Sequence, residues 1–147
     1  MLLKMKKYKV EMTEEGEKHF SVGAVLKNKG KYLLIERKIY PPGFACPSGH
    51  IDEGESPEEA LKKEVKEETG LKIKDMKLII HEVVPWNECS RGVKIHEWYI
   101  YECRFDGELK LSKRETKGGG WYTPEEINGM ELEEVWKYWF GKLGVLK

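Results

Sequence analysis

The chain has 147 residues, of which 39% are hydrophobic and 35% are charged. That length is enough to bury a hydrophobic core, and we expect residues 1–147 to form a single soluble domain. Lys and Arg together number 26, as do Asp and Glu, so the formal net charge is zero. This balance does not favour nucleic acid or an anionic membrane surface as a partner.

The cysteines and the N-terminus indicate a cytoplasmic protein. Cys46, Cys89 and Cys103 are scattered and form no CxxC pair, which is typical of a reduced, intracellular chain. The opening MLLKMKKYKV lacks the apolar run of a signal peptide, and no later segment approaches the length of a membrane span. We therefore expect no membrane partner, and the sequence leaves a homodimer open.

Strand-forming residues dominate the first two-thirds of the chain. Lys27-Asn-Lys-Gly30 separates two stretches rich in such residues and predicts the turn of a β-hairpin. Tyr40-Pro-Pro-Gly43 predicts a loop, because proline cannot donate a ladder hydrogen bond. Lys113–Trp121 is rich in glycine and also predicts a loop. The predicted strands are residues 19–26, 31–36, 76–84 and 93–105.

One helix is predicted between these strands. Ser56 and Glu59 have the spacing of a capping box at a helix N-terminus. Pro57 suits the first helical position and Gly70 suits the position after the last turn. We therefore expect a helix over residues 57–69.

A second helix is predicted over residues 131–143. Its apolar side chains fall on one side, which is typical of core packing rather than of a base-stacking surface. Strands followed by few helices predict an α+β fold with a mixed sheet. The apolar stripe consists of Leu132, Val135, Trp136, Trp139, Phe140 and Leu143.

The first helix carries a group of like charges. At about 100° per residue, Glu64, Glu67 and Glu68 share one arc beside the apolar face. Carboxylates next to a core are costly unless a cation compensates them, and their hard oxygen donors suit Mg²⁺ or Mn²⁺. The alternative is a solvated face of a Glu/Lys-rich helix. The preceding Pro47–Glu55 loop favours the metal, because its glycines could present further oxygens to a metal and a phosphate.

These residues belong to a longer pattern. Gly49, five residues, Glu55, seven residues and the stretch Lys63–Leu71 resemble the Nudix box, Gx5Ex7REUxEExGU, in which U is aliphatic. Every fixed position agrees except the arginine, which is Lys63 here. The pattern constrains many positions in a short stretch, so the resemblance is specific.

Two further segments extend the resemblance. Leu33-Leu-Ile-Glu-Arg37 is similar to the family's strand that ends in arginine, and Trp121-Tyr-Thr-Pro-Glu-Glu-Ile127 is similar to its C-terminal W-x-x-x-E-E-aliphatic segment. The similarity covers about residues 18–128. It implies the family's fold, an α/β/α sandwich around a mixed sheet.

The resemblance also implies an activity. A Nudix hydrolase cleaves a pyrophosphate bond in a nucleoside diphosphate linked to another group X, by means of a metal-activated water. Glu64, Glu67 and Glu68 match the box glutamates that bind Mg²⁺ or alternatively Mn²⁺, and Gly49 matches a glycine whose carbonyl can bind the ion. Glu64 is also a candidate general base, and a small-molecule nucleotide would be the partner.

Lys63 is the departure from the family pattern. In the family an arginine orients the first box glutamate, and a guanidinium can hold a carboxylate through two hydrogen bonds. Lysine offers only a point charge, so we expect Lys63 to pair less rigidly with Glu55 or Glu64 and to reduce activity rather than abolish it. Glu55 and Gly70 complete the box as supporting residues.

A second candidate base lies outside the box. Glu115 stands six residues before Trp121, where some mutator-type relatives place a metal-binding glutamate. It therefore rivals Glu64 as the proton acceptor. The alternative is a loop glutamate that pairs with Arg114 or Lys117.

The remaining candidates concern substrate binding. Arg37 could contact a phosphate, or it could be an ordinary arginine at the end of a strand. Trp86 could stack on a base, although loop packing is the alternative. Phe44 and Ser48 lie where the family's substrate cleft is lined, but their identities are not diagnostic. One further set has the residue types of a zinc site, although its scatter in the sequence does not favour one: Cys46, His50, Cys89 and His96.

The substrate is the least determined feature. The compact chain and the placement of Glu115 favour a (deoxy)nucleoside triphosphate. An ADP-ribose or nucleotide-sugar pyrophosphatase is the first alternative. The second is a non-catalytic nucleotide sensor, although such modules usually lose box glutamates, and all of them are present here.

Overall fold

The structure is a computed structural model that describes residues 7–38 and 40–147. In chain order its elements are β1 (Val10–Thr13), β2 (Gly16–Asn28), β3 (Lys31–Arg37), β4 (Phe44–Ala45), β5 (Ser48–His50), α1 (Pro57–Thr69), β6 (Lys72–Val84), β7 (Ile95–Asp106), β8 (Thr116–Tyr122), α2 (Pro124–Asn128) and α3 (Glu134–Lys142). The strands form a mixed sheet with the order β4-β3-β2-β7-β6. In addition, β1 and β5 pair with β2, and β8 pairs with β3. The β2–β7 pair is parallel, and the other pairs are antiparallel.

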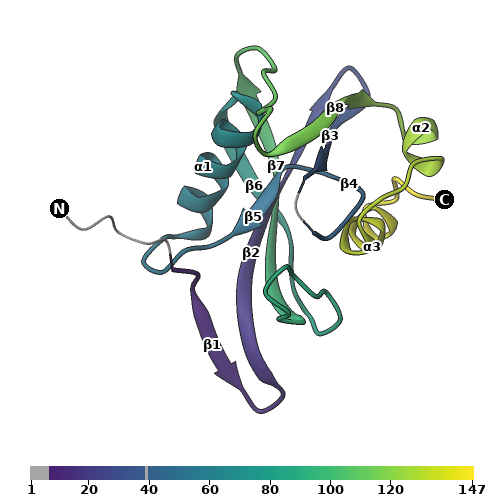
Figure 1. The fold of residues 1–147 in the computed structure, drawn as a ribbon. Coiled ribbons are helices and arrows are strands. Elements are labelled where there is room, and N and C mark those ends of the chain that lie inside the picture. Colours follow the sequence, from purple (N-terminus) through teal and green to yellow (C-terminus); the bar gives the residue numbers. More distant parts are fainter. Residues whose placement is uncertain (1–6, 39) are drawn as a thin grey trace.

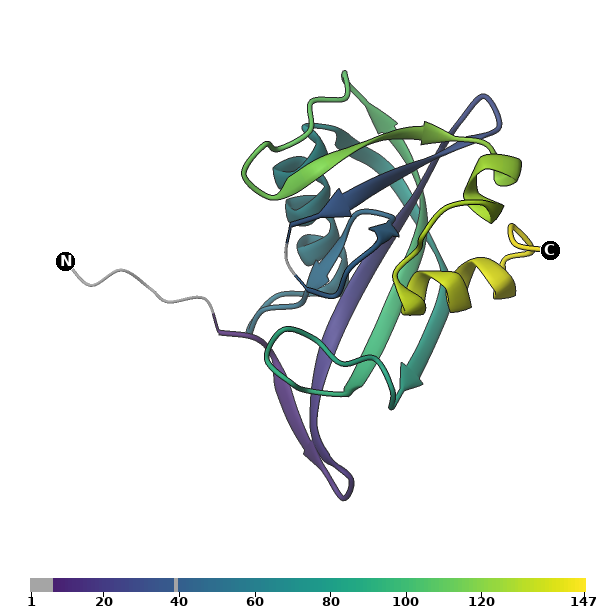
Figure 2. The same cartoon turned by 45° about the vertical axis from the view of Figure 1, so that its right-hand side comes forward.

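Helices cover both faces of the sheet. Figures 1 and 2 show α1 on one side and α2 and α3 on the other. Leu61 and Val65 of α1 are buried in a core cluster with residues of β2. On the opposite side, Trp136 and Trp139 of α3 pack against Trp98 of β7. This arrangement confirms the predicted α+β fold, an α/β/α sandwich around a mixed sheet.

Local sequence fixes both ends of α1. Ser56 Oγ accepts a hydrogen bond from Glu59 N at 3.1 Å, and Glu59 Oε1 accepts one from Ser56 N at 3.1 Å. Gly70 follows the helix with a φ of 74°, a conformation that costs glycine little. The predicted bounds of this helix are confirmed. They fix which face of α1 the acidic residues occupy.

The predicted hairpin is formed by β2 and β3. Asn28 pairs with Lys31, which leaves Lys29 and Gly30 in the turn, both with positive φ. β2 begins earlier than predicted, at Gly16, because it continues into pairing with β1. It is the central strand of the sheet, and most of its length is buried.

The next two predicted strands are β6 and β7. β6 begins at Lys72 rather than at residue 76, because it pairs with β7 as far as Asp106 through a bulge. β7 in turn runs parallel to β2, with His96 as the register partner of His19. Residues distant in the sequence therefore become neighbours in the middle of the sheet.

The glycine-rich segment before Trp121 is a strand, and the predicted loop is wrong there. β8 pairs with β3 along its length. A Cβ atom on Gly119 would lie 2.5 Å from the carbonyl oxygen of Leu34, so glycine lets the two strands approach closely. The sequence pattern does not distinguish this role of glycine from its role in a loop.

The C-terminal helix α3 begins at Glu134, later than the predicted Glu131. The backbone of the preceding residues is bound to β4 instead. Phe44 N donates to Glu131 O at 2.8 Å, and Glu133 N donates to Phe44 O at 2.9 Å. This pairing holds Glu133 in the interior. The short helix α2, which begins with a capping box at Thr123, is not among the predicted elements.

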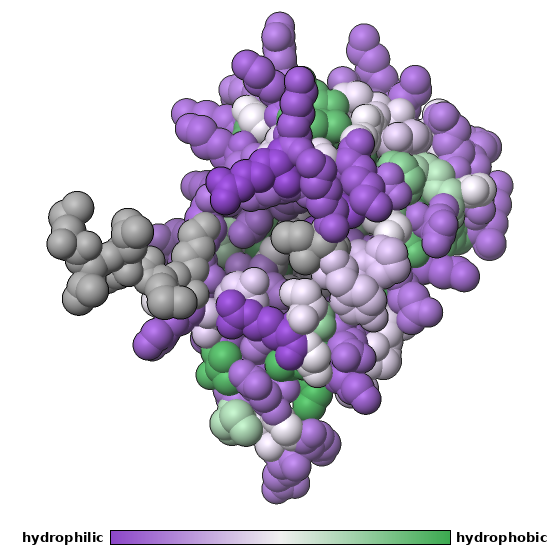
Figure 3. Space-filling model, in the orientation of Figure 1, coloured by the Kyte–Doolittle hydropathy of each residue, from purple (hydrophilic) through white to green (hydrophobic). Residues whose placement is uncertain are grey.

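The surface is mostly hydrophilic. Figure 3 shows polar and charged residues over most of one face, with small apolar groups near the lower end, where β1 lies. Exposed apolar residues include Val10 and Met12 of β1. Within residues 7–38 and 40–147, no helix is both long enough and apolar enough to cross a lipid bilayer.

Candidate active site

The acidic residues of α1 line an open cavity of about 200 Å³, called here the acidic cavity. Glu67 is exposed at its rim, Glu64 is half-buried, and Glu68 is only 3% exposed. The other residues that line it are Tyr8, Arg37, Gly49, His50, Asp52 and Glu115. The structure therefore brings together most of the site residues predicted for metal binding and catalysis.

Gly49 and Glu64 are packed so closely that a larger residue does not fit. Gly49 lies in β5, where it pairs with Val22 of β2. A Cβ atom on Gly49 would lie 2.4 Å from Glu64 Cδ and 2.7 Å from its Oε2. A side chain here would push the Glu64 carboxylate out of position. The box glycine thus has a steric role in addition to the carbonyl that it could offer to a cation.

The carboxylates of α1 disfavour one another's charged forms. Burial, followed by the charge of Glu67, raises the pKa of Glu64 to about 7. Burial also raises the pKa of Glu68 well above its ordinary value, and although Arg37 opposes this shift, Glu64 reinforces it. Such groups lose their charge near neutral pH unless a positive partner is supplied.

Glu68 also has an unsatisfied oxygen. Its Oε1 is buried and has no hydrogen-bond partner among the residues that the structure describes. An unpaired buried polar atom costs roughly 1–3 kcal/mol. A cation in the acidic cavity would remove this cost and the repulsion among the acids. Carboxylate and carbonyl oxygens are the donors that Mg²⁺ and Mn²⁺ prefer, so the residues present fit such an ion.

Lys63 pairs with Glu55, one of its two expected partners, and also with Asp52. Its Nζ lies 2.7 Å from Glu55 Oε2 and 2.9 Å from Asp52 Oδ2. Glu55 Oε1 accepts a further hydrogen bond from Asp52 N at 2.8 Å. Burial alone would lower the pKa of Lys63, but these hydrogen bonds raise it above its ordinary value. Lys63 is therefore charged, and its hydrogen bonds fix the loop that precedes α1.

Glu115 reaches the acidic cavity from the turn that precedes β8. Its N–H donates to Ser112 Oγ at 3.2 Å, and its carbonyl accepts a hydrogen bond from Lys38 N at 3.1 Å. Ser112 N also donates to Glu68 O at 2.9 Å, which ties the turn to the end of α1. After burial, the charge of Glu115 contributes to the raised pKa of both Glu64 and Glu68. The predicted candidate base thus lies close to the box glutamates.

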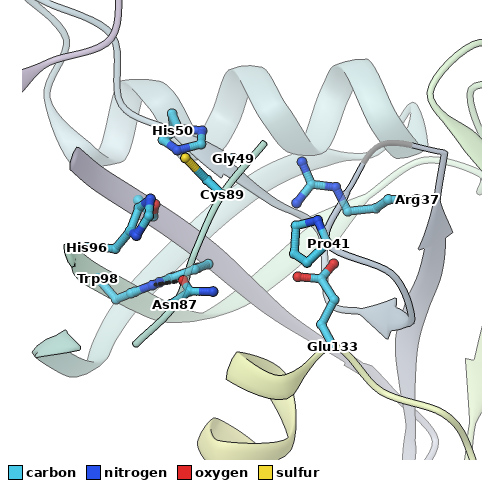
Figure 4. Close-up of a pocket in the computed structure, with 10 residues that line it drawn as sticks. Arg37, Pro41, Gly49, His50, Asn87, Cys89, His96, Trp98 and Glu133 are labelled. Atoms are coloured by element: carbon cyan, nitrogen blue, oxygen red, sulfur yellow. Dashed lines mark hydrogen bonds between the residues drawn. The ribbon is translucent and has the colours of Figure 1, made fainter. Parts of the chain in front are cut away.

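Glu133 is a candidate that sequence reasoning missed. It is 2% exposed, and burial raises its pKa to about 7, although Arg37 opposes the shift. Burial alone would lower the pKa of Arg37, but the charges of Glu68 and Glu133 raise it. Figure 4 shows Arg37 and Glu133 on the same side of a small cavity, near Pro41. Its position in the sequence could have identified Glu133, because it stands between Leu132 and Val135 of the predicted apolar stripe.

This second cavity, of about 30 Å³, adjoins the acidic cavity. The two cavities share Arg37, Gly49 and His50. At this volume the second cavity is the size of about one water molecule, too small to hold a nucleoside without rearrangement. The remaining lining residues are Ser21, Pro41, Asn87, Cys89, His96, Trp98 and Glu133, and all of them except Ser21 are labelled in Figure 4.

Three predicted substrate-binding residues do not line these two cavities. Phe44 packs on the core cluster beneath α3. Ser48 is fully buried, and its Oγ donates to Cys46 O at 3.0 Å. Trp86 is 42% exposed and contacts Tyr138 edge to face. In this structure Arg37 is the predicted substrate-binding residue that reaches the carboxylates.

Comparison with known proteins identifies the family. The NUDIX domain model matches residues 17–140, a stretch that contains all of α1, β5 and β8. The chain belongs to the Nudix hydrolase family. Its box residues, with Lys63 in place of the arginine, therefore lie in the family's own structural setting on α1 and in the loop before it.

Relatives of this Nudix chain are named for different activities. The nucleoside triphosphatase NudI of Enterobacter sp. (strain 638) is 27% identical over 137 residues, which cover 83% of this chain and 94% of that protein. The human NAD-capped RNA hydrolase NUDT12 is 32% identical over 101 residues, which cover 66% of this chain. The chain spans only 20% of the length of the NUDT12 relatives that it matches.

A solved structure shares the fold. The crystal structure of a MutT NUDIX hydrolase from Burkholderia pseudomallei matches with a TM-score of 0.72 at 22% identity. The match covers 82% of this chain and 94% of that chain. The sandwich with α1 on one face of the sheet is therefore a known Nudix architecture.

Proposed function

We propose that this chain hydrolyses a pyrophosphate bond in a nucleoside diphosphate linked to a group X, with a (deoxy)nucleoside triphosphate as the preferred substrate and Mg²⁺ or Mn²⁺ as cofactor. The observation that carries the proposal is the single cavity in which the α1 carboxylates, Glu115 and Arg37 meet. Carboxylates alone would repel a polyphosphate, so divalent cations have to join the enzyme to its substrate.

Each group in the acidic cavity then has a role. When bound, the divalent ions would neutralise phosphate oxygens and lower the pKa of the attacking water. Arg37 would bind a phosphate oxygen through its fixed positive charge. Glu64 and Glu115 are rival acceptors of the proton from water. The residues that would hold the ions are Gly49, Glu64, Glu67 and Glu68.

Two observations favour a triphosphate over the other substrates. The relative named nucleoside triphosphatase NudI is matched over 94% of its length, whereas the NAD-capped RNA hydrolase NUDT12 is matched over 20%. Glu115 also lines the same cavity as the box glutamates, and some mutator-type relatives place a metal-binding glutamate similarly. ADP-ribose and nucleotide sugars remain the alternative substrates, because their pyrophosphate would meet the same groups.

A substrate panel with and without Mg²⁺ tests the proposal. The chain would be offered nucleoside triphosphates, ADP-ribose, nucleotide sugars, NAD and NAD-capped RNA, and released phosphate, pyrophosphate and nucleotide would be measured. We expect cation-dependent turnover, fastest for a triphosphate. Nucleotide binding without turnover of any compound would favour a sensor and overturn the proposal.

The identity of the base needs a separate comparison. Glu115→Gln and Glu64→Gln would be assayed side by side on the preferred substrate. If Glu115 accepts the proton, its variant loses turnover while it still binds the divalent ion. A nearly normal rate in Glu115→Gln removes it from the mechanism and leaves Glu64.

We also propose a cytoplasmic location for the chain. Cys46, Cys89 and Cys103 are free and buried, which is compatible with a reducing compartment. Fractionation of the cells that express it naturally would test this location.

A further inference from the structure

A buried group of nitrogen and sulfur donors lies beside the acidic cavity and has no role in the proposed hydrolysis. It consists of His19, His50, Cys89 and His96, called here the histidine cluster. Each residue offers one donor atom, and these atoms all lie within 4.8 Å of one another. Figure 4 shows His50, Cys89 and His96 gathered on one side of the small cavity, away from Arg37 and Glu133.

The sheet itself brings the three histidines together. His19 and His96 are register partners in the parallel β2–β7 pair, so their side chains project from the same face. Ser21, two residues further along β2, is the register partner of His50 in β5, which places His50 on that face too. Their ring centroids lie 5.2, 5.4 and 5.6 Å apart. This placement depends on the central pairing of the sheet and not on a mobile loop.

The β6–β7 loop adds the sulfur. Cys89 N donates to Val93 O at 3.0 Å, and Gly92 N donates to Cys89 O at 2.9 Å, so a tight turn holds the residue. The Cys89 side chain is directed inward and is 8% exposed. Its Sγ lies 3.8 Å from His19 Nδ1. The loop therefore closes the histidine cluster from the side opposite the strands.

Two donor atoms of the histidine cluster lack partners. His50 Nε2 and His96 Nε2 are buried, and the described part of the chain offers neither a hydrogen bond. His96 as a whole is 1% exposed, so bulk solvent does not reach this atom. Buried polar atoms without partners in a native protein call for an explanation, and an ion between them is one.

The spacing suits a tetrahedral ion. With Zn–N bonds of about 2.0–2.1 Å and a Zn–S bond of about 2.3 Å, neighbouring ligand atoms lie roughly 3.3–3.6 Å apart. The 3.8 Å between Cys89 Sγ and His19 Nδ1 needs only a small contraction. The four donor atoms lie within 4.8 Å of one another, so the widest pair would have to contract by up to about 1.5 Å. His19 Nε2 is 3.4 Å from Glu17 Oε1, the kind of second contact that orients a metal-binding histidine.

We propose that the histidine cluster binds one zinc ion in a closed site that fixes the β6–β7 loop against the sheet, next to the active-site cavities. Four protein ligands leave no open coordination position, so the ion is structural rather than catalytic. Imidazole and thiolate donors select zinc over the Mg²⁺ that suits the acidic cavity. Cys46, which the sequence grouped with the other candidates, is buried in the core beneath α3, and His19 takes its place.

Metal analysis of the untagged protein tests this proposal. The full chain, made without a polyhistidine tag, would be incubated with zinc, freed of excess metal by gel filtration and analysed by mass spectrometry. We expect about one zinc per chain. In Cys89→Ser and in His96→Gln the zinc content should fall at least tenfold. Cys103→Ser, which changes another buried free cysteine outside the cluster, is the matched control and should keep the ion.

A second measurement needs no variant. Cobalt bound to a thiolate in tetrahedral geometry gives a charge-transfer band and intense visible bands, and we expect both in the wild-type chain after cobalt replaces zinc. Absence of these bands together with absence of bound zinc overturns the proposal. Equal zinc content in wild type, Cys89→Ser and His96→Gln overturns it as well. Because both readouts work without substrate, their failure is distinct from a failure of the proposed hydrolase activity.

Discussion

The acidic cavity and the histidine cluster meet at His50, which belongs to the cluster and also lines the cavity, and their electrostatics are opposite. In the acidic cavity, carboxylates crowd together and raise one another's pKa values. In the histidine cluster the His50 and His96 rings are neutral, because burial lowers the pKa of His50 to about 3 and that of His96 to about 4. The carboxylates of the acidic cavity keep their negative charge near neutral pH only beside a positive partner, whereas the two imidazoles are neutral without one.

The difference also concerns access. The acidic cavity is open and has a volume of about 200 Å³, large enough for ions that enter and leave with a substrate. The histidine cluster is mostly buried between the sheet and the β6–β7 loop. The open cavity thus suits divalent ions that exchange with solvent, and its donors are oxygens. The buried cluster suits an ion that stays bound, and its donors are nitrogen and sulfur.

The largest effect should come from the acidic side. Glu64→Gln removes a charged ligand and candidate base, so we expect kcat to fall by roughly 10²–10⁴-fold. Zinc content should not change, because the histidine cluster does not use this residue. Lys62→Gln, an exposed change on the same helix, serves as the control. If Glu64→Gln also lost zinc, the ion would depend on a carboxylate of the acidic cavity and not on the histidine cluster alone.

Stability should fall with rising pH on account of Glu133. Its folded-state pKa is about 7, against an ordinary value of 4.5. Between these values the folded state holds a proton that the unfolded state has lost, so raising the pH through this window destabilises the fold. The free energy of unfolding falls by about 3 kcal/mol across this window. Glu133→Gln should flatten this part of the profile in denaturant unfolding, and an unchanged slope would contradict the assignment.

The histidine cluster should have the opposite pH dependence. His96 has a folded-state pKa of about 4, below its ordinary value of 6.5. As the pH falls through this window, His96 binds a proton in the unfolded state but not in the folded state. The free energy of unfolding of the metal-free protein therefore falls by up to about 3 kcal/mol. His96→Gln should remove part of this acid sensitivity. Unfolding in the presence of a chelator at several pH values measures it.

A smaller effect is expected where the two regions touch. In Gly49→Ala the new methyl group would meet the Glu64 carboxylate, and we expect kcat to fall roughly 10–100-fold through misplacement of that ligand. Gly120→Ala, where a Cβ atom would meet open space, is the matched control. Equal activity in both variants would show that the Glu64 side chain can move without loss.

The smallest effect is expected at Lys63. Its ammonium already bridges Glu55 and Asp52, and an arginine could hold the same carboxylates through more hydrogen bonds. Lys63→Arg should therefore preserve or raise kcat. A drop of tenfold or more would refute this role, and Lys62→Arg on the exposed face controls for the exchange itself.

Features encoded within a few residues were predictable. The capping box at Ser56 and the glycine after α1 fix the helix locally, and α1 then fixes the angular spacing of its glutamates. Arg37 and Glu115 were placed by resemblance to the family, and the structure brings both to the acidic cavity. The partner of Lys63 was predicted in part, because Asp52 approaches through a turn whose shape the sequence pattern does not specify.

Features that depend on pairing between distant segments were not predictable. Glu133 is buried because its backbone joins β4, and β8 is a strand because its glycines fit against β3. The histidine cluster requires the register of β2 with both β5 and β7, which no local pattern encodes. For the same reason, the sequence grouped Cys46 with His50, Cys89 and His96, whereas the structure places His19 beside those three residues.

Gly49 and His50 are adjacent in the chain, so zinc in the histidine cluster and ions in the acidic cavity would act on the same stretch of backbone. Zinc held by His50 would restrict the backbone on which Gly49 meets Glu64, and so would change the affinity for divalent ions in the acidic cavity. Linkage is reciprocal, so ions and substrate in that cavity would change the affinity for zinc by the same factor.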